Sequence, residues 1–257
     1  MQDKVALIAG GAGDIGAACA RAYAHYGARI IIFDRDPGKI RERLDEWKKE
    51  GIQADSYCGD ITDEEFLESM VKEIAAISMV KEIAAIYGRI DIALNNIAVT
   101  NRKPMLEFTT AQWRDVIDIN LNGAYYFLRE VGRVMCGQDR GKIIQILSTG
   151  AYRFGANFSA YGASKAGVSA LVKCLAVEWA PHNIQVNGIA PTATETGFTR
   201  DYYREYPERM EATIQNHPYK RLGQPEDYVG AAVYLASEAA DFVNGEVIII
   251  DSGKTVK

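Results

Sequence analysis

The sequence is poor in cysteine and histidine, the residues that most often bind zinc or form disulfides. Its four cysteines (Cys19, Cys58, Cys136 and Cys174) are scattered and include no C-x-x-C pair. The three histidines are not spaced as metal ligands either. We therefore expect neither a disulfide framework nor a metal site.

The sequence also lacks a long apolar run, a secretory signal pattern and any block of like charge. A predicted strand begins at Val5, which leaves no room for a leader after Met1. The net charge is −5 and is spread evenly, which argues against nucleic acid or an anionic membrane as a partner. We expect a cytoplasmic protein that acts on a small molecule.

The chain does contain a regular alternation of short apolar runs and helical stretches. Its 257 residues, 48% of them hydrophobic, can bury the core of one α/β domain. The pattern predicts strands at 5–9, 29–33, 54–58, 90–94, 142–147, 185–189 and 246–250. Strands alternating with helices predict a single Rossmann-like, doubly wound domain, with a central parallel sheet of about seven strands flanked by helices.

A glycine-rich segment, Gly10-Gly11-Ala12-Gly13-Asp14-Ile15-Gly16, lies between the first predicted strand and a helix. Glycines at such a junction let the backbone approach a pyrophosphate, which then rests on the helix N-terminus. The segment therefore predicts a dinucleotide site.

The next strand ends in Asp34, a carboxylate that can accept the hydroxyls of an adenosine ribose and would repel a 2′-phosphate. The alternative is an ordinary turn residue at a strand end. Arg35 is adjacent, but the glycine segment holds no cation, so we expect NAD rather than NADP. Asp60, after the third strand, either reaches the adenine or is likewise only a turn residue.

Tyr161 and Lys165 are four residues apart and share one face of a predicted helix. A nearby ammonium favours the phenolate and lowers the pKa of a tyrosine, which allows it to act as an acid and base. Ser148 ends the fifth strand, at the edge of the sheet where ligands bind, and could hold a substrate oxygen. Y-x-x-x-K alone is also compatible with an ordinary helix face.

These elements together resemble the classical short-chain dehydrogenase/reductase family over nearly the whole chain. The T-G-x-x-x-G-I-G motif of that family falls on 9–16, with Ala9 and Asp14 departing from it. We expect Asp14 to tolerate the left-handed backbone of a glycine, although a carboxylate near a pyrophosphate should weaken affinity. The N-N-A-G motif becomes Asn95-Asn96-Ile97-Ala98, and the P-G motif becomes Pro191-Thr192.

The resemblance implies a catalytic tetrad of Asn120, Ser148, Tyr161 and Lys165. Tyr161 would be the acid–base, Ser148 would bind the reacting oxygen, and Lys165 would lower the tyrosine pKa and hold the nicotinamide ribose. Asn120, in a long helix predicted from Thr109 or Thr110 to Cys136, would anchor a proton-relaying water. Hydride would pass between nicotinamide and a secondary alcohol carbon.

Within the family, the segments 175–180 and 242–245 resemble gluconate 5-dehydrogenase and other sugar-acid and polyol dehydrogenases. A 3-oxoacyl-type reductase or a steroid or secondary-alcohol dehydrogenase shares most of the same residues. A non-catalytic NAD-binding regulatory protein is a further alternative, disfavoured by the intact tetrad. The resemblance also implies a homo-oligomer, a tetramer or a dimer.

Two further sets of residues complete the predicted site. The expected cofactor contacts are Gly10, Gly13, Asp14, Ile15, Gly16, Asp34, Arg35, Asp60, Ile61, Asn96, Ile97, Ala98, Tyr161, Lys165, Pro191, Thr194 and Thr196. The expected substrate contacts are Arg102, Arg153, Asn157 and Tyr202. A guanidinium can hold a carboxylate in a bidentate fork, although Arg102, Lys103 and Arg153 could also be solvated surface charges. Residues 192–220 are interpreted as a substrate lid, the alternative being a surface excursion.

One segment is repeated without change, since SMVKEIAAI occupies both 69–77 and 78–86. Nine residues advance an α-helix by about 900°, so the apolar sides of the two copies face in nearly opposite directions. Only one copy can seat its Met, Val and Ile side chains on the sheet, and identical sequences do not say which. Because the helix start at Asp60 is committed to the nucleotide, we expect the first copy to pack. The extra residues should then protrude near 78–88, as a loop or as an overlong helix, away from the active site.

Overall fold

Seven parallel strands form the central sheet of the protein, as the sequence predicted. The computed structural model describes residues 1–75 and 88–256. The strand order is β3-β2-β1-β4-β5-β6-β7, and every pairing is parallel. The strands are β1 (Val5–Ala9), β2 (Arg29–Asp34), β3 (Ala54–Cys58), β4 (Ile92–Asn95), β5 (Gly141–Ile146), β6 (Ile184–Pro191) and β7 (Val247–Ile250).

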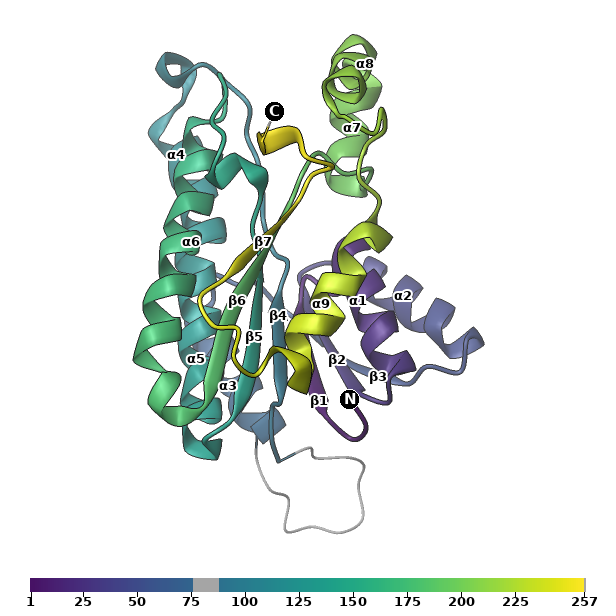
Figure 1. Ribbon diagram of the computed structural model, residues 1–257, viewed down its shortest axis with the longest axis vertical. Helices are drawn as coiled ribbons and strands as arrows, with labels where there is room; N and C mark the ends of the chain where they lie inside the picture. The colour runs from purple at the N-terminus through teal and green to yellow at the C-terminus, as the bar shows by residue number, and fades with distance from the viewer. Residues whose placement is uncertain (76–87, 257) are drawn as a thin grey trace.

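Helices cover both faces of the sheet and make it doubly wound (Figure 1). One face carries α1 (Asp14–His25), α2 (Pro37–Lys49) and α9 (Val229–Ala236). The other carries α3 (Glu64–Ala75), α4 (Thr110–Ile117), α5 (Gly123–Gln138) and α6 (Ser159–Glu178). The segment predicted to be a lid, residues 192–220, contains α7 (Gly197–Glu205) and α8 (Pro207–Asn216), which stand at the carboxyl edge of the strands.

The strands are continuous apolar runs because they are buried from both sides. All five residues of β1 are buried, and their side chains alternate between two core clusters, one on each face of the sheet. Burial on both faces is typical of parallel sheets, in which helical crossovers cover each side. The polar residues that follow the strands are therefore gathered along one edge.

One predicted helix differs from the observed one. The long helix expected from 109 or 110 to 136 is interrupted by a π-helical turn, η2 (Asp118–Asn122), between α4 and α5. This turn holds Asn120, and π-turns inside helices are frequent at functional sites. Later in the chain, a 3-10 turn, η5 (Pro225–Tyr228), precedes α9.

Residues 69–75 of the first copy of the repeated segment pack on the sheet, as expected, and the last two residues of that copy lie outside the described residues. Met70, Val71 and Ile74 are each 2% exposed and belong to the core cluster shared by α3, α5 and α6. The second copy, and the expected protrusion at 78–88, lie outside the described residues except for Gly88.

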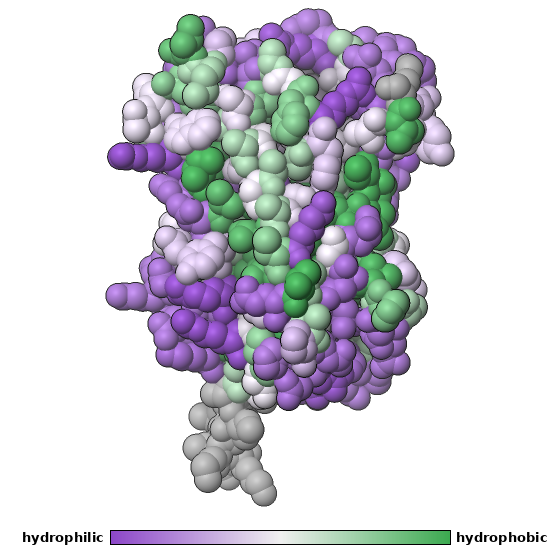
Figure 2. Space-filling view, turned by 60° about the vertical axis from the view of Figure 1, so that its left-hand side comes forward, coloured by the Kyte–Doolittle hydropathy of each residue, from purple (hydrophilic) through white to green (hydrophobic). Residues whose placement is uncertain are grey.

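A band of apolar side chains runs along the face that Figure 2 turns toward the viewer, between more polar flanks. Exposed apolar patches on soluble proteins often mark contact surfaces. None of the helices in the described ranges is long and apolar enough to span a bilayer.

The repeated segment allows a matched test of which copy holds the core position. Ile74→Ala should lower the free energy of unfolding by about 2–5 kcal/mol, the usual range for emptying a buried isoleucine site. Ile83→Ala makes the same change at the equivalent position of the second copy and should cost far less. Chemical denaturation of both variants measures this difference. Equal losses would show that both copies are packed.

Candidate active site

A cleft of about 910 Å³ lies along the carboxyl edge of the sheet and under the lid. It is lined from the glycine turn at one end to Arg153 and Lys254 at the other. Every expected cofactor residue lines it except Gly16, and so do three tetrad members, Ser148, Tyr161 and Lys165. The structure thus brings together residues from almost the whole chain at the edge where parallel sheets bind ligands.

The glycine turn at the start of the cleft leaves room for a dinucleotide. Gly10 has a φ of +73°, and a Cβ there would lie 3.1 Å from main-chain atoms of Asn96 and Ile97. A Cβ on Gly16 would lie 2.3 Å from the Gly10 carbonyl oxygen, so only glycine lets α1 pack this closely on the turn. The free N–H groups at the start of α1 then face the cleft, where they suit a pyrophosphate.

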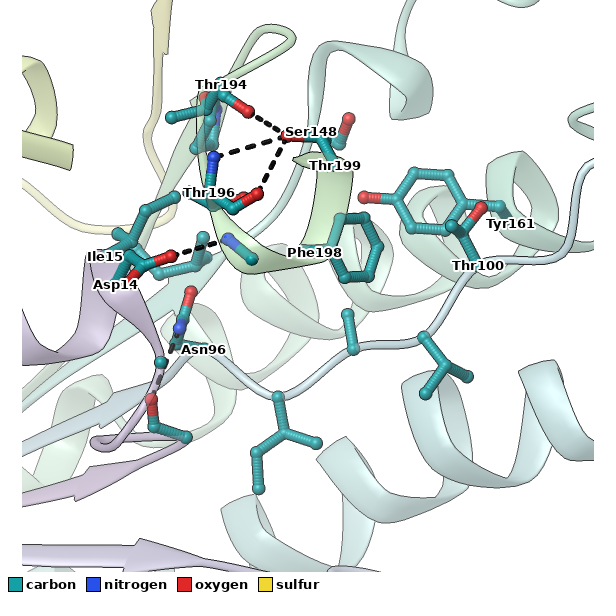
Figure 3. Close-up of a pocket in the computed structure, with 18 of the residues that line it drawn as sticks. Asp14, Ile15, Asn96, Thr100, Ser148, Tyr161, Thr194, Thr196, Phe198 and Thr199 are labelled. Carbon is teal, nitrogen blue, oxygen red and sulfur yellow. Dashed lines mark hydrogen bonds between the residues drawn. The ribbon is translucent and has the colours of Figure 1, made fainter. Parts of the chain in front are cut away.

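Asp14 differs from its expected role. It does not adopt a left-handed backbone; the positive φ lies at Gly10, and Asp14 is the first residue of α1. Its carboxylate is also not left as a bare negative charge beside the pyrophosphate site. Oδ1 accepts a hydrogen bond from Arg43 Nη2 at 3.1 Å, and Oδ2 accepts one from Gly197 N at 2.7 Å (Figure 3).

The acidic and amide residues at the nucleotide end follow β2, β3 and β4. Asp34 lies at the end of β2 and accepts a hydrogen bond from Asp36 N at 3.3 Å. Asp60 lines the cleft and also accepts hydrogen bonds from the main-chain N–H and the hydroxyl of Thr62. These local bonds stabilise the turn after β3, so Asp60 is also a turn residue. Asn96 Nδ2 donates to the Gly10 carbonyl at 3.3 Å, which ties the loop after β4 to the glycine turn.

Tyr161 and Lys165, in the first turns of α6, are buried at the centre of the cleft. Burial raises the pKa of the Tyr161 phenol, whereas its hydrogen bond with Ser148 and the positive charge of Arg102 lower it. Burial lowers the pKa of Lys165 to about 8, and its ammonium donates to the Ile146 carbonyl at 3.0 Å. The phenol and the ring of Phe198, whose centroid is 6.5 Å from that of Tyr161, border the same part of the cleft (Figure 3).

The expectation that Lys165 lowers the pKa of Tyr161 stays a prediction. The Lys165 ammonium is 5.9 Å from the centroid of the Tyr161 ring, and the groups that lower the tyrosine pKa in this structure are Ser148 and Arg102. Desolvation lowers the pKa of Lys165 itself.

Asn120, the fourth tetrad member, is 1% exposed and acts through its side chain on the neighbouring loops. Its carboxamide accepts a hydrogen bond from Val99 N at 2.7 Å and donates to Val99 O at 2.9 Å. It also donates to Ser164 Oγ at 3.0 Å, and Ser164 in turn donates to the Tyr161 carbonyl at 2.8 Å. Both amide hydrogens are therefore used to position the cleft wall and the catalytic helix.

Arg102 is the best-placed of the expected substrate residues. Its guanidinium carbon lies 4.6 Å from the ring centroid of Phe158 and 4.1 Å from that of Tyr202. Within the described part of the chain, its Nε and the hydroxyl of Thr100 are buried without a hydrogen-bond partner, and both residues line the cleft. Buried polar groups are normally paired, so these two fit a polar ligand.

The other expected substrate residues are placed less uniformly. Arg153 lines the cleft, and its Nη1 donates to the Lys254 carbonyl at 2.5 Å. Tyr202 does not line the cleft but packs against the guanidinium of Arg102, which does. Asn157 does not line the cleft either, and its backbone is left-handed, with a φ of 66°.

Several lining residues were not anticipated from the sequence. They are Val99, Thr100, Ile119, Phe154, Phe158, Phe198, Arg200 and Lys254, together with Lys39 and Arg43 at the nucleotide end. Thr100 and Val99 follow the N-N-A-G position directly, so that motif could have indicated them. Lys254 carried no such signal, because it reaches the cleft only through the final turn after β7.

Known proteins similar to this chain share its length and fold. A family model described as enoyl-(acyl carrier protein) reductase matches residues 10–255. Gluconate 5-dehydrogenase of Gluconobacter oxydans is 33% identical over 98% of this chain and 94% of its own length. The 5-keto-D-gluconate 5-reductase of Escherichia coli is 35% identical over 98% of this chain and 96% of its own.

A solved structure gives the same picture in three dimensions. The gluconate 5-dehydrogenase of Burkholderia cenocepacia, in complex with NADP and tartrate, has a TM-score of 0.91 and 32% identity. The match covers all of this chain and 97% of that one. With the glycine turn, the tetrad and the cleft in place, we conclude that the chain belongs to the short-chain dehydrogenase/reductase family, in its gluconate dehydrogenase branch.

Proposed function

We propose that this oxidoreductase interconverts a secondary alcohol and a ketone on a small hydroxy acid, such as a sugar acid, with NAD(H) as its cofactor. The observation that carries the proposal is Arg102, a cation held between two aromatic rings in the cleft with its Nε buried and unpaired in the described structure. A planar guanidinium can hold a carboxylate through two parallel hydrogen bonds.

The charges that line the cleft support an acidic substrate. All the carboxylates in the lining (Asp14, Asp34, Glu42 and Asp60) lie at the nucleotide end, whereas Arg102, Arg153 and Lys254 line the substrate end. Desolvation and the nearby charge of Arg153 lower the pKa of Lys254, whereas the charge of Asp251 raises it. The names of the relatives, which act on gluconate or keto-gluconate, point to the same substrate class.

The roles of the reacting residues follow from their positions. Ser148 would bind the carbonyl or hydroxyl oxygen of the substrate, next to the phenol of Tyr161. Tyr161 would give its proton to that oxygen during reduction and take it back during oxidation. Lys165 would hold the nicotinamide ribose, and Arg102 would orient the substrate by its carboxylate. When bound, the nicotinamide supplies or accepts the hydride.

The choice of NAD rests on Asp34, whose carboxylate lines the cleft at the end of β2. It can accept ribose hydroxyls and would repel a 2′-phosphate. Of the cations nearby, Arg43 pairs with Asp14 and Glu46, and Lys39 lies 4.0 Å from Asp36. Arg35, next to Asp34, also lines the cleft and is the cation that would favour a 2′-phosphate. The Burkholderia structure contains NADP, so cofactor preference is the part of this proposal that most needs measurement. A homo-oligomer in the cytoplasm also remains a prediction.

Tyr161→Phe removes the proposed acid–base while keeping the ring, and should lower kcat about 10²–10⁴-fold with little change in NADH affinity.

Because burial raises the pKa of Tyr161, the phenol holds its proton at neutral pH. Alcohol oxidation, which needs the phenolate, should therefore rise as pH increases above neutral, whereas ketone reduction should not. Steady-state rates in both directions across pH measure this. Substantial activity in the variant would refute the assignment.

Arg102→Ala should raise KM for an acidic sugar about 10–100-fold, the effect of losing a hydrogen bond to a charged group. The corresponding neutral sugar alcohol should be affected little, so the variant should lose its preference for the acid. Arg102→Lys keeps the positive charge but not the bidentate guanidinium, so its KM for the acidic sugar should lie between those of the unmodified protein and Arg102→Ala. The control is Arg204→Ala, an exposed cation on α7 that pairs with Asp201. An unchanged KM, or turnover of apolar alcohols only, would favour the secondary-alcohol alternative.

The unmodified protein should use NAD with a higher kcat/KM than NADP, because the 2′-phosphate would face Asp34. Asp34→Ala should reduce the difference between the two kcat/KM values, because it weakens the binding of NAD and removes the repulsion of the 2′-phosphate of NADP. Kinetics with both cofactors at one ionic strength test this. Equal kcat/KM values in the unmodified protein would contradict it.

A further inference from the structure

Asp14 stands where the family motif has glycine, and its carboxylate joins three elements of the fold. Its own position is the first residue of α1. Oδ2 accepts a hydrogen bond from the main-chain N–H of Gly197, the first residue of α7, at 2.7 Å (Figure 3). Oδ1 accepts one from Arg43 of α2 at 3.1 Å. The nucleotide turn is thereby connected to the lid.

The electrostatics of this arrangement favour the contact. The N-termini of α1 and α7 both carry partial positive charge, and a carboxylate between them is stabilised by each. Arg43 offsets the full negative charge, which reduces the repulsion that a neighbouring pyrophosphate would feel. Hydrogen bonds to a charged group are stronger than neutral ones, so this is a substantial contact for an exposed part of the lid.

The position of the contact gives it a consequence for cofactor exchange. Asp14 and Gly197 both line the cleft, with Gly13 and Ile15 beside them. The first N–H groups of α1 are the ones suited to the pyrophosphate, so the Asp14–Gly197 hydrogen bond closes over the place where it would lie. The lid is also anchored near its base by Thr199, whose hydroxyl bonds to the main-chain carbonyls of Thr194 and Thr196. Gly197 lies between these residues, at the first residue of α7, so the Asp14 contact adds a bond from the nucleotide turn to the anchored start of this helix.

We propose that the Asp14–Gly197 hydrogen bond is a latch that holds α7 over the bound dinucleotide and slows its release, which makes Asp14 a positioning residue. The inference rests on the proposed nicotinamide cofactor. Two opposing effects follow from the same carboxylate, because its charge disfavours the pyrophosphate while its hydrogen bond retains it. With Arg43 neutralising the charge, retention is the larger effect.

The test compares Asp14→Gly, which restores the residue of the family motif, with Asp14→Asn. NADH release is followed by stopped-flow fluorescence, and amide hydrogen exchange of α7 is measured in the cofactor-free protein. Asp14→Gly should release NADH roughly tenfold faster, the effect of losing about 1.4 kcal/mol, and the amides of Gly197–Glu205 should exchange faster. Asp14→Asn keeps an oxygen that can accept a hydrogen bond from Gly197 but loses the ion pair with Arg43. Its NADH release rate and its α7 exchange rates should therefore lie between those of the unmodified protein and Asp14→Gly.

Asp201→Asn is the matched control, since Asp201 is an exposed carboxylate on α7 that pairs only with its neighbour Arg204 among the described side chains. It should leave NADH release and the exchange of α7 unchanged. Unaltered α7 exchange in Asp14→Gly, or NADH release that is equal or slower, would overturn the latch. Failure of the unmodified protein to bind NADH would instead contradict the proposed function, and the exchange measurement would still decide whether Asp14 holds the lid.

Discussion

The buried carboxamide of Asn120 is the contact on which the geometry of the reaction centre depends. It lies in a π-helical turn and is bonded to both main-chain groups of Val99 and to Ser164, whose hydroxyl bonds to the Tyr161 carbonyl. The bonds to and from Ser164 are buried, so breaking one would leave a polar group unpaired at about 1–3 kcal/mol, whereas those to Val99 are partly buried. The loop after β4 and the start of α6 are thereby held in a fixed relation.

The second organising feature is the distribution of charge along the cleft. Carboxylates and the cations Arg35, Lys39 and Arg43 line the nucleotide end together, whereas the charged residues at the substrate end are cations. Tyr161 lies between the two ends, and the nearby charge of Arg102 partly offsets the effect of burial on its pKa. The same guanidinium can therefore bind a carboxylate and adjust the acid–base residue. A bound carboxylate would partly cancel its charge and thus raise the pKa of the phenol, which keeps the proton on Tyr161 until the substrate oxygen takes it.

Local signals explain why the sheet, the glycine turn and the tetrad could be predicted from the sequence. A strand followed by glycines, or a tyrosine four residues before a lysine, is recognisable within one short segment. The contacts of the lid were beyond such reasoning, since Asp14 and Gly197 are 183 residues apart and Arg102 meets Tyr202 only in the folded chain. The π-turn at Asn120 was missed because helix propensity does not distinguish a widened turn from an ordinary one. The burial that lowers the pKa of Lys165 could not be predicted either, because it is a property of the packed core.

The cations at the substrate end also bear on how quickly an anion can be captured. The chain as a whole carries a net charge of −5, so a distant anion experiences weak repulsion rather than attraction. Only within about one Debye length, about 8 Å at physiological ionic strength, do Arg102, Arg153 and Lys254 dominate the local field. Encounter is then governed by diffusion to the cleft mouth, without the long-range steering that accelerates many enzymes with charged substrates. In such a site, selectivity for an acid arises from a slower dissociation of the bound ligand and not from a faster association.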